Sequence, residues 1–197
     1  MSSDATGARP AFEVRASRSA RAREIVDAAR ALLEAGGPRG MSLRRVGDAV
    51  GMRAPSLYKH FSSRRDLELA LVEDGLVEMG AVLHGAISGP AGGRIAVLLS
   101  AYRSVGRASP ELYRLSTSVS FPRSELPAGL EAWAGEPFFT ATGEPALAQA
   151  LWSFAHGTMI LELDRRFLEG SDLDGTWEAG GRAFESVRRG LTGHAAG

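Results

Sequence analysis

Apolar residues recur at intervals of three and four positions along most of this chain, which is the spacing of helices that bury one face. Sustained strand alternation is not found in the sequence. In the first helical segment the apolar positions are Ile25, Ala28, Ala29, Leu32 and Leu33. Ser17 or Ser19 is expected to cap this helix, and Gly36-Gly37-Pro38 to end it. The pattern predicts an all-α protein.

Two short helical segments follow, joined by a glycine. Ser42 is expected to cap the first segment and Gly51 to end it, because glycine readily adopts a positive φ after a helix. The second segment begins near Ala54-Pro55, where a proline in the first turn costs no hydrogen bond. The predicted buried side chains of the pair are Leu43, Val46, Val50, Leu57 and Phe61. Neither segment is long enough to be stable alone, so both need longer helices as a platform.

The rest of the chain continues the helical pattern with breaks. A fourth helix is expected from a cap at Ser62 or Ser63 to the stop at residues 88–90. Further helices are predicted at 91–107, at 110–118, at 144–168, and from a cap at Asp172 or Asp174 to about residue 191. Residues 121–143 hold repeated prolines and glycines, so we expect a loop with one short helix there. The total is about nine helices.

Charge is unevenly distributed, although the chain as a whole has a net charge of zero. Residues 1–65 carry 13 basic and 6 acidic side chains, and residues 66–197 carry 10 basic and 17 acidic ones. A basic N-terminal part can bind a polyanion, and an ordinary solvated surface with chance asymmetry is the alternative. Cysteine is absent, which excludes disulfides, thiolate metal sites and a cysteine nucleophile.

The two short helices with a glycine in their turn form a predicted helix-turn-helix, whose second helix enters the major groove of DNA. The run MSLRRVGDAVGMRAPSLYKHFSSRRDLELAL resembles the N-terminal domain of the TetR family of bacterial transcriptional regulators, over roughly residues 18–75. Gly47 departs from the alanine common in the family, and we expect it to allow closer packing of the first helix. Further along, LWSFAHGTMILEL resembles the WHG type of TetR C-terminal domain, through Trp152, His156 and Gly157.

The resemblance implies which side chains contact DNA. Tyr58 and His60 correspond to phosphate contacts, as does Arg64, which opens the fourth helix where backbone N–H groups also favour a phosphate. Base contacts are expected from Arg44, Arg53, Ser56 and Lys59, the last of which faces either phosphate or base. The full expected set is Ser42, Arg44, Arg53, Ala54, Ser56, Tyr58, Lys59, His60 and Arg64. For Arg45 and Arg65 a solvated charge or an intramolecular ion pair is the simpler interpretation.

The resemblance also implies a domain organisation: a disordered leader at 1–16, a helix-turn-helix DNA-binding domain at 17–65, and a helical ligand-binding and dimerisation domain at 66–197. The last two long helices are expected to form a homodimer on a palindromic operator. The expected lining of a ligand pocket is Tyr102, Leu115, Phe121, Trp133, Phe138, Trp152, His156 and Met159. Ordinary core packing is the alternative for each of them. Glu162 is expected either in an interface ion pair or in the pocket.

Other function classes find less support in the sequence. A di-iron site needs Glu-x-x-His pairs, and none of the four histidines has a glutamate three residues before it. His-Glu-x-x-His and phosphate-loop motifs are also absent, so we expect no enzyme, no cofactor and no metal. We expect a cytoplasmic repressor released by a small apolar ligand. An effector-independent repressor and an activator of the same fold are the alternatives.

Overall fold

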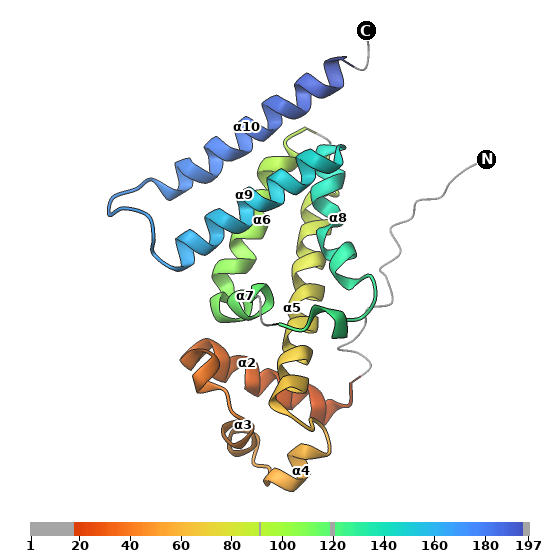
Figure 1. Ribbon diagram of the computed structural model, residues 1–197, viewed down its shortest axis with the longest axis vertical. Helices are drawn as coiled ribbons and strands as arrows, with labels where there is room; N and C mark the ends of the chain where they lie inside the picture. The colour runs from red at the N-terminus through yellow and green to blue at the C-terminus, as the bar shows by residue number, and fades with distance from the viewer. Residues whose placement is uncertain (1–17, 91, 119–120, 195–197) are drawn as a thin grey trace, which may run out of the picture.

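The computed structural model describes residues 18–90, 92–118 and 121–194, and every regular element in these ranges is a helix (Figure 1). The helices are α2 (Ala20–Gly40), α3 (Leu43–Ala49), α4 (Ala54–Tyr58), α5 (Arg64–Ile87), α6 (Arg94–Ala108), α7 (Pro110–Thr117), the short 3-10 helix η1 (Arg123–Glu125), α8 (Leu130–Thr142), α9 (Pro145–Leu163) and α10 (Leu173–His194). The all-α class and the count of about nine helices are confirmed for these ranges. The expected disordered leader at 1–16 lies outside the described residues, as does Ser17.

The first helices begin where serine side chains satisfy the free backbone N–H groups of the first turn. Ser19 Oγ accepts from Ala22 N at 3.2 Å, and Ser42 Oγ accepts from Arg45 N at 3.3 Å. Ser63 Oγ accepts from Asp66 N at 3.1 Å, which decides between the two serines expected there. These caps confirm the predicted helix starts.

Glycines end the helices of this region. Gly37 has a φ of 61° and interrupts α2 just before Pro38, so the expected stop is a sharp break after which helical turns resume to Gly40. Gly51 has a φ of 64° in the turn between α3 and α4. The expectation for Gly47 was wrong, because a Cβ there would lie 3.0 Å from the carbonyl oxygen of Met52 and would not touch α2. Glycine at this position lets the turn, and not the first helix, approach closely.

The first hydrophobic core joins α2, α3 and α4 to the start of α5. Its buried members are Ile25, Val26, Ala29, Leu33, Met41, Val46, Leu57, Phe61, Leu67, Ala70, Leu71 and Leu112. Val46 and Leu57 are almost fully buried, so the two short helices are held by tertiary packing, as their lengths require. Leu112 comes from α7, which places α7 against this core.

A second core fills the opposite end of the molecule. α5 runs the length of this part, with α6 and α8 packed beside it, and α9 and α10 lie across them (Figure 1). The buried members include Leu83, Leu98, Leu99, Tyr102, Tyr113, Phe138, Leu151, Ala155, Met159 and Trp177. No helix in the described ranges has the length and apolar content to cross a bilayer.

The segment 121–143 contains a loop followed by one helix, as predicted, but the helix is longer than expected. α8 spans 13 residues and continues through Gly135 and Pro137. Pro137 has no N–H to donate to the carbonyl of Trp133, four residues before it. His84 Nε2 of α5 lies 3.0 Å from that carbonyl oxygen, and the His84 and Trp133 rings stack at 5.0 Å. A side chain of α5 therefore supplies the contact that the proline withholds.

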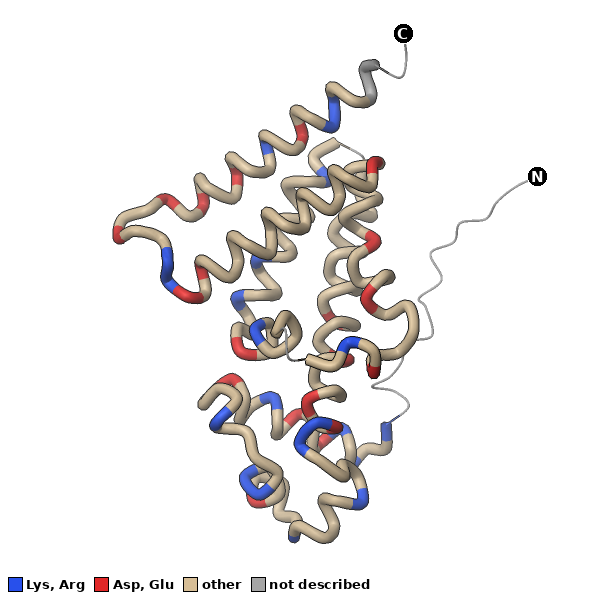
Figure 2. Tube along the Cα trace, viewed as in Figure 1, with Lys and Arg blue, Asp and Glu red and all other residues tan. Residues whose placement is uncertain are grey.

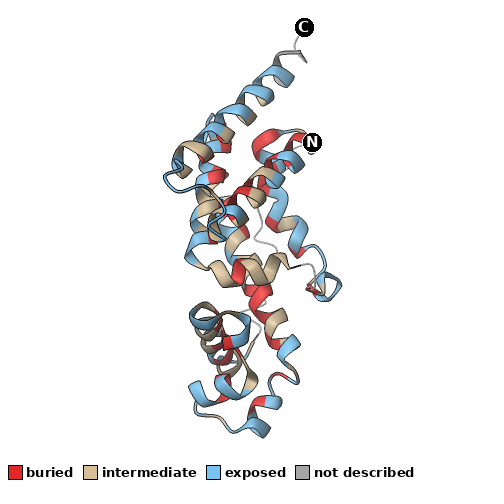
Figure 3. Cartoon of the chain, turned by 60° about the vertical axis from the view of Figure 1, so that its left-hand side comes forward, coloured by how far each residue is buried: buried red, intermediate tan, exposed pale blue. Residues whose placement is uncertain are grey.

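The last two helices also have different bounds from those predicted. α9 ends at Leu163, five residues early, and Arg165 just beyond it has a φ of 52°. Asp172 Oδ1 accepts from Gly175 N at 2.8 Å, which makes Asp172 the cap of α10. The C-terminal half of α10 extends beyond the helices on which its first half packs (Figures 1 and 3).

Candidate nucleic-acid interface and ligand cavity

The residues expected to contact DNA belong to α3, α4, the turns beside them and the first residue of α5, and these elements lie at one end of the molecule (Figure 1). The exposed members of the set are Arg44, Arg53, Ala54, Ser56, Tyr58, Lys59, His60 and Arg64. Ser42 is half-buried because its hydroxyl caps α3. Figure 2 shows arginine and lysine at this end. Arg44, Arg53 and Lys59 make no side-chain hydrogen bond or ion pair with any part of the chain that the structure describes. Their charges are available to a phosphate or a base.

Arg64 is held differently from these three cations. Its Nη2 donates to the carbonyl oxygen of Pro38 at 2.8 Å, and its Nε donates to Glu68 Oε1 at 2.7 Å. The side chain therefore ties the start of α5 to the end of α2. Arg65 pairs with Glu125, which confirms the intramolecular interpretation for that residue.

Two further groups that sequence reasoning missed fix the orientation of the short helices. Arg21 Nη2 donates to the carbonyl oxygen of Val50 at 2.7 Å, which joins α2 to the end of α3. Asp66 accepts from the hydroxyls of Ser62 and Ser63 in the turn between α4 and α5. The Ser62 hydroxyl is the main reason that the pKa of Asp66 is below its ordinary value. Asp66 thus stays ionised and holds the turn next to the exposed end of α4.

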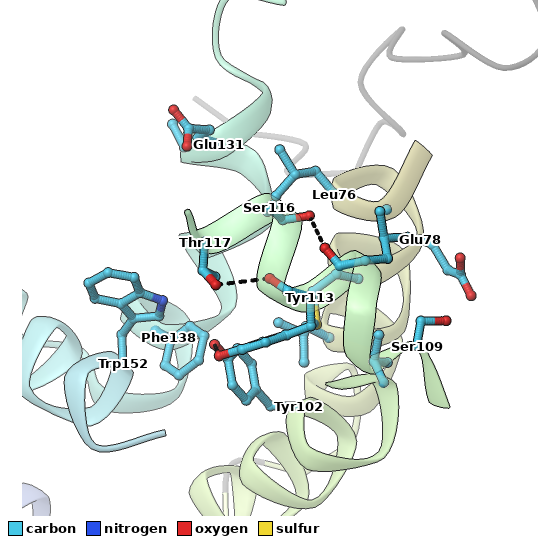
Figure 4. A pocket seen from close by; sticks show the side chains of 18 of the residues that line it. Leu76, Glu78, Tyr102, Ser109, Tyr113, Ser116, Thr117, Glu131, Phe138 and Trp152 are labelled. Carbon is cyan, nitrogen blue, oxygen red and sulfur yellow. Dashed lines mark hydrogen bonds between the residues drawn. The ribbon is translucent and has the colours of Figure 1, made fainter. Parts of the chain in front are cut away.

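A cavity of about 670 Å³ lies between α5, α6, α7, α8 and α9 (Figure 4). Tyr102, Phe138 and Trp152 line it, as the sequence predicts for a pocket. The other lining side chains are mostly apolar and include Leu76, Met79, Leu83, Val105, Leu112, Tyr113, Phe139 and Ala148. Tyr113 is a lining residue that sequence reasoning missed. The sequence signal that could have identified Tyr113 is that it is an aromatic residue in the short helix expected at 110–118.

Five of the residues expected in the pocket lie outside its lining: Leu115, Phe121, Trp133, His156 and Met159. Phe121 is buried with Val72, and Leu115 packs against that pair. Trp133 fills the space over Gly80, where its ring would lie 2.4 Å from an added Cβ. Met159 is fully buried against Gly106.

His156 lies behind the cavity wall. Its Nδ1 is 2.8 Å from the hydroxyl of Tyr113, and that hydroxyl is 2.7 Å from the hydroxyl of Tyr102. The Trp152 ring stacks on the imidazole at 5.7 Å. Burial lowers the pKa of His156, and the charge of Arg123 lowers it further, so the imidazole is neutral near pH 7.

Glu162 does not line the cavity, and its carboxylate forms an ion pair inside this chain. Its carboxylate accepts from Arg103 Nε of α6 at 2.9 Å and from Trp177 Nε1 of α10 at 2.8 Å. Burial alone would raise the pKa of Glu162, but these hydrogen bonds and the Arg103 charge outweigh burial and hold the pKa below its ordinary value. The carboxylate joins α6, α9 and α10.

The DNA-binding end and the cavity share side chains. Arg30 of α2 lines the cavity, and its Nη2 donates to Ser109 Oγ at 2.8 Å while its Nη1 pairs with Glu78 at 2.6 Å. One turn further along α2, the carboxylate of Glu34 accepts from the backbone N–H groups of Glu111 and Leu112 at 3.1 and 3.0 Å. These N–H groups belong to the first turn of α7, whose free donors favour an anion.

Comparison with known proteins agrees with this geometry. Residues 25–71 match the family model described as bacterial regulatory proteins, tetR family. This match supports a relation of the helix-turn-helix region to the TetR family. The family model covers the helix-turn-helix region alone, and the WHG resemblance of the C-terminal part has no support from it. No curated protein matches the chain.

Solved structures show the same fold. A protein of unknown function from Rhodococcus sp. RHA1 is 24% identical, with a TM-score of 0.72 over 88% of this chain and 96% of its own. A possible TetR family transcriptional regulator from Streptomyces coelicolor A3(2) is 17% identical, with a TM-score of 0.63 over 86% and 99%. The multidrug binding protein EbrR, complexed with imidazole, is 21% identical, with a TM-score of 0.63 over 84% and 95%. These three structures show the fold alone, and the support for DNA-binding transcriptional regulation comes from the family-model match to residues 25–71.

Proposed function

We propose that this protein is a homodimeric repressor that binds a palindromic operator and is released by a small apolar ligand in the cavity of about 670 Å³. The observation that carries the proposal is the position of Arg30, which belongs to the first helix of the helix-turn-helix region and lines the cavity. A ligand there would touch the DNA-binding part directly. We assign no catalytic role, and we place the protein in the cytoplasm, where its operator would lie.

The DNA surface would consist of the nine residues expected from the family motif. Arg44, Arg53 and Lys59 support this, since they are exposed and carry charges that no other described group neutralises. Tyr58, half exposed beside them, can donate its hydroxyl to a phosphate. For Arg64 a phosphate contact would have to use the donor capacity left after Glu68 and Pro38.

Dimerisation is supported by apolar side chains left exposed on the last two helices. Leu161 of α9 is 42% exposed, and Val187 and Leu191 of α10 are 52% and 48% exposed. A second copy that covered them would bury the part of α10 that extends beyond the body of the chain. We expect Leu191→Glu to convert the dimer to a monomer in light scattering and to weaken operator binding. A dimer that persists in this variant and in Val187→Glu would contradict the interface.

Ligand binding would release DNA because both binding events depend on the same conformational equilibrium of the protein. A ligand shifts the equilibrium only by the difference between its affinities for the DNA-binding and the released conformations. Arg30 and Glu34 give a physical connection between the cavity and α2 through which such a difference could arise. A repressor that needs no effector would be expected to have a fully packed C-terminal core. The cavity of about 670 Å³ argues against that alternative.

The test is fluorescence anisotropy of the purified chain with DNA from just upstream of its own gene and with a scrambled duplex, over a salt series. We expect tight binding to the first duplex and weak, steeply salt-dependent binding to the second. A transcription assay on the same template distinguishes a repressor from an activator. Failure to bind either duplex at low salt would overturn the assignment of α3 and α4 to DNA.

A further inference from the structure

The charged side chains that line the cavity are neutralised by one another. Arg30 pairs with Glu78 at 2.6 Å, and Arg123 pairs with Glu131. Both arginines also donate to uncharged acceptors, Arg30 to Ser109 Oγ and Arg123 to a backbone carbonyl. Among the described residues, no other member of the lining carries a charge. A charged ligand would therefore lose its hydration without finding an unpaired opposite charge.

The inner polar groups of the cavity are neutral. The hydroxyls of Tyr102 and Tyr113 lie beside Phe138 and Trp152, on the side of the cavity away from Glu78 and Ser109 (Figure 4). Burial raises the pKa of Tyr102 to about 12 and raises the pKa of Tyr113 as well, so both hydroxyls keep their protons. The hydroxyls of Ser116 and Thr117 instead donate to backbone carbonyls of their own helix.

The Tyr102–Tyr113–His156 chain has hydrogen-bonding capacity left over for a ligand. If His156 Nδ1 carries no proton, Tyr113 donates to it and Tyr102 donates to Tyr113, so the Tyr102 oxygen is left as an acceptor. If Nδ1 carries the proton, it donates to Tyr113, and one hydroxyl proton is left to donate. A neutral histidine can adopt either tautomer. These three hydrogen-bonded side chains can therefore accept a hydrogen bond from a ligand hydroxyl or donate one to a ligand carbonyl.

The walls beside these hydroxyls are aromatic. The Phe138 ring meets the Tyr102 ring edge to face at 5.7 Å, and Trp152 of α9 lines the cavity beside Phe138 (Figure 4). Flat rings of this kind suit an aromatic or otherwise planar apolar ligand.

We propose that the cavity binds an uncharged, largely aromatic ligand with one hydroxyl or carbonyl group, which hydrogen-bonds to the Tyr102–Tyr113 pair. This inference rests on the proposed function, because it concerns the ligand that would release the operator. It makes Tyr102 and Tyr113 the residues that select the polar group, with His156 acting through Tyr113 as a positioning residue.

The test is isothermal titration calorimetry of the full chain near pH 7 with naphthalene and four derivatives. These are 2-naphthol, 2-acetylnaphthalene, 2-naphthoate and 2-naphthylmethylammonium. We expect naphthol and acetylnaphthalene to bind about tenfold more tightly than naphthalene and than either charged probe, the size of one well-placed hydrogen bond. Tighter binding of naphthoate or of the ammonium probe would overturn the inference.

Variants that remove one tyrosine hydroxyl distinguish the proposed hydrogen bond to the ligand from apolar contacts with it. Tyr102→Phe and Tyr113→Phe should each lower the affinity for naphthol several-fold and leave the affinity for naphthalene unchanged. Ser100→Ala, which removes an exposed hydroxyl of α6 outside the cavity lining, is the control and should change neither. Equal naphthol affinity in both cavity variants and the wild type would contradict the hydroxyl anchor, and circular dichroism checks that each variant is folded.

Operator binding measured with the same probes distinguishes the two proposals. Charged probes that bind best and release DNA would support ligand-dependent release of the operator, contradict the apolar character of the ligand and overturn the inference. Binding of the neutral probes in the expected order without any release of DNA would support the inference on ligand class and contradict the regulatory role. No binding of any probe would overturn both the ligand class and the ligand-dependent part of the proposed function.

Discussion

At the scale of single residues, what separates the side chains of the DNA-binding end is whether their charges are already paired. Arg44, Arg53 and Lys59 are exposed and unpaired in the described part of the chain, whereas Arg64 and Arg65 are engaged within it. The ion pair of Arg65 was expected, but the sequence motif groups Arg64 with the three unpaired cations, because it carries no information about where a neighbouring carbonyl or carboxylate lies. The positioning side chains Arg21 and Asp66 were missed for the same reason.

We expect Arg44→Ala to reduce the preference for operator over scrambled DNA, because an arginine bound to a guanine edge contributes about 1–3 kcal/mol of discrimination. Anisotropy with both duplexes measures this ratio. Arg166→Ala is the matched control, since Arg166 is an exposed arginine between α9 and α10. An equal loss of affinity for both duplexes in Arg44→Ala would assign Arg44 to a phosphate.

At the scale of elements, helices form where tertiary contacts compensate for poor local sequence. Caps and glycine stops predicted α2 to α5 well, because these signals are local. One helix was expected in the segment that contains α8, but its full length was not, because the partner that allows Pro137 inside a helix is His84, 53 positions earlier in the chain. The bounds of the cavity were equally inaccessible to sequence, since its lining depends on how five helices cross.

The His84–Pro137 relation predicts a coupled loss of stability. His84→Phe should lower the free energy of unfolding by about 1 kcal/mol, because it removes the hydrogen bond to the Trp133 carbonyl oxygen. In a Pro137→Ala background, residue 137 regains a backbone N–H that can donate to the Trp133 carbonyl oxygen. His84→Phe should then lower the free energy of unfolding by less than it does in the wild type. Urea denaturation of the four variants gives the coupling energy, and additive losses would contradict the compensation.

Glu162 predicts a pH dependence of stability. Its pKa is lowered in the folded protein, so its stabilising effect is fully present above the unfolded pKa and is lost as pH falls through the folded pKa. Glu162→Gln should therefore lower stability by about 2 kcal/mol near pH 7 and by less near pH 3. Glu178→Gln, which alters an exposed ion pair on α10, is the control and should change little at either pH.

At the scale of the whole molecule, α2 and α7 connect the two hydrophobic cores. Glu34 caps α7, Arg30 bonds Ser109 between α6 and α7, and Leu112 of α7 is buried in the first core. A ligand that displaced α7 would therefore change the contacts that α7 makes with α2. The predicted domain boundary at residue 65 lies within the first turn of α5, which runs through both cores.

We expect Glu34→Gln to weaken the coupling between ligand and operator, because a neutral amide holds the N–H groups of α7 less strongly than a carboxylate. Binding of 2-naphthol to the free protein should change little, while more 2-naphthol should be needed to release DNA. Glu169→Gln, an exposed glutamate remote from α2, serves as the control. Unchanged release in Glu34→Gln would mean that α7 is not the connection.

The shared first core has a consequence for exchanging modules between regulators. Leu67 and Leu71 of α5 and Leu112 of α7 are all nearly inaccessible to solvent within it. A hybrid joined at residue 65 would bring foreign side chains into all three positions at once, and the recipient's short helices would lose their matched platform. A crossover after Leu71 preserves two of the three, and the residue at 112 then has to be chosen to fit the incoming helices. Joining residues 72–197 of this protein to another helix-turn-helix region is thus a problem of repacking one leucine site.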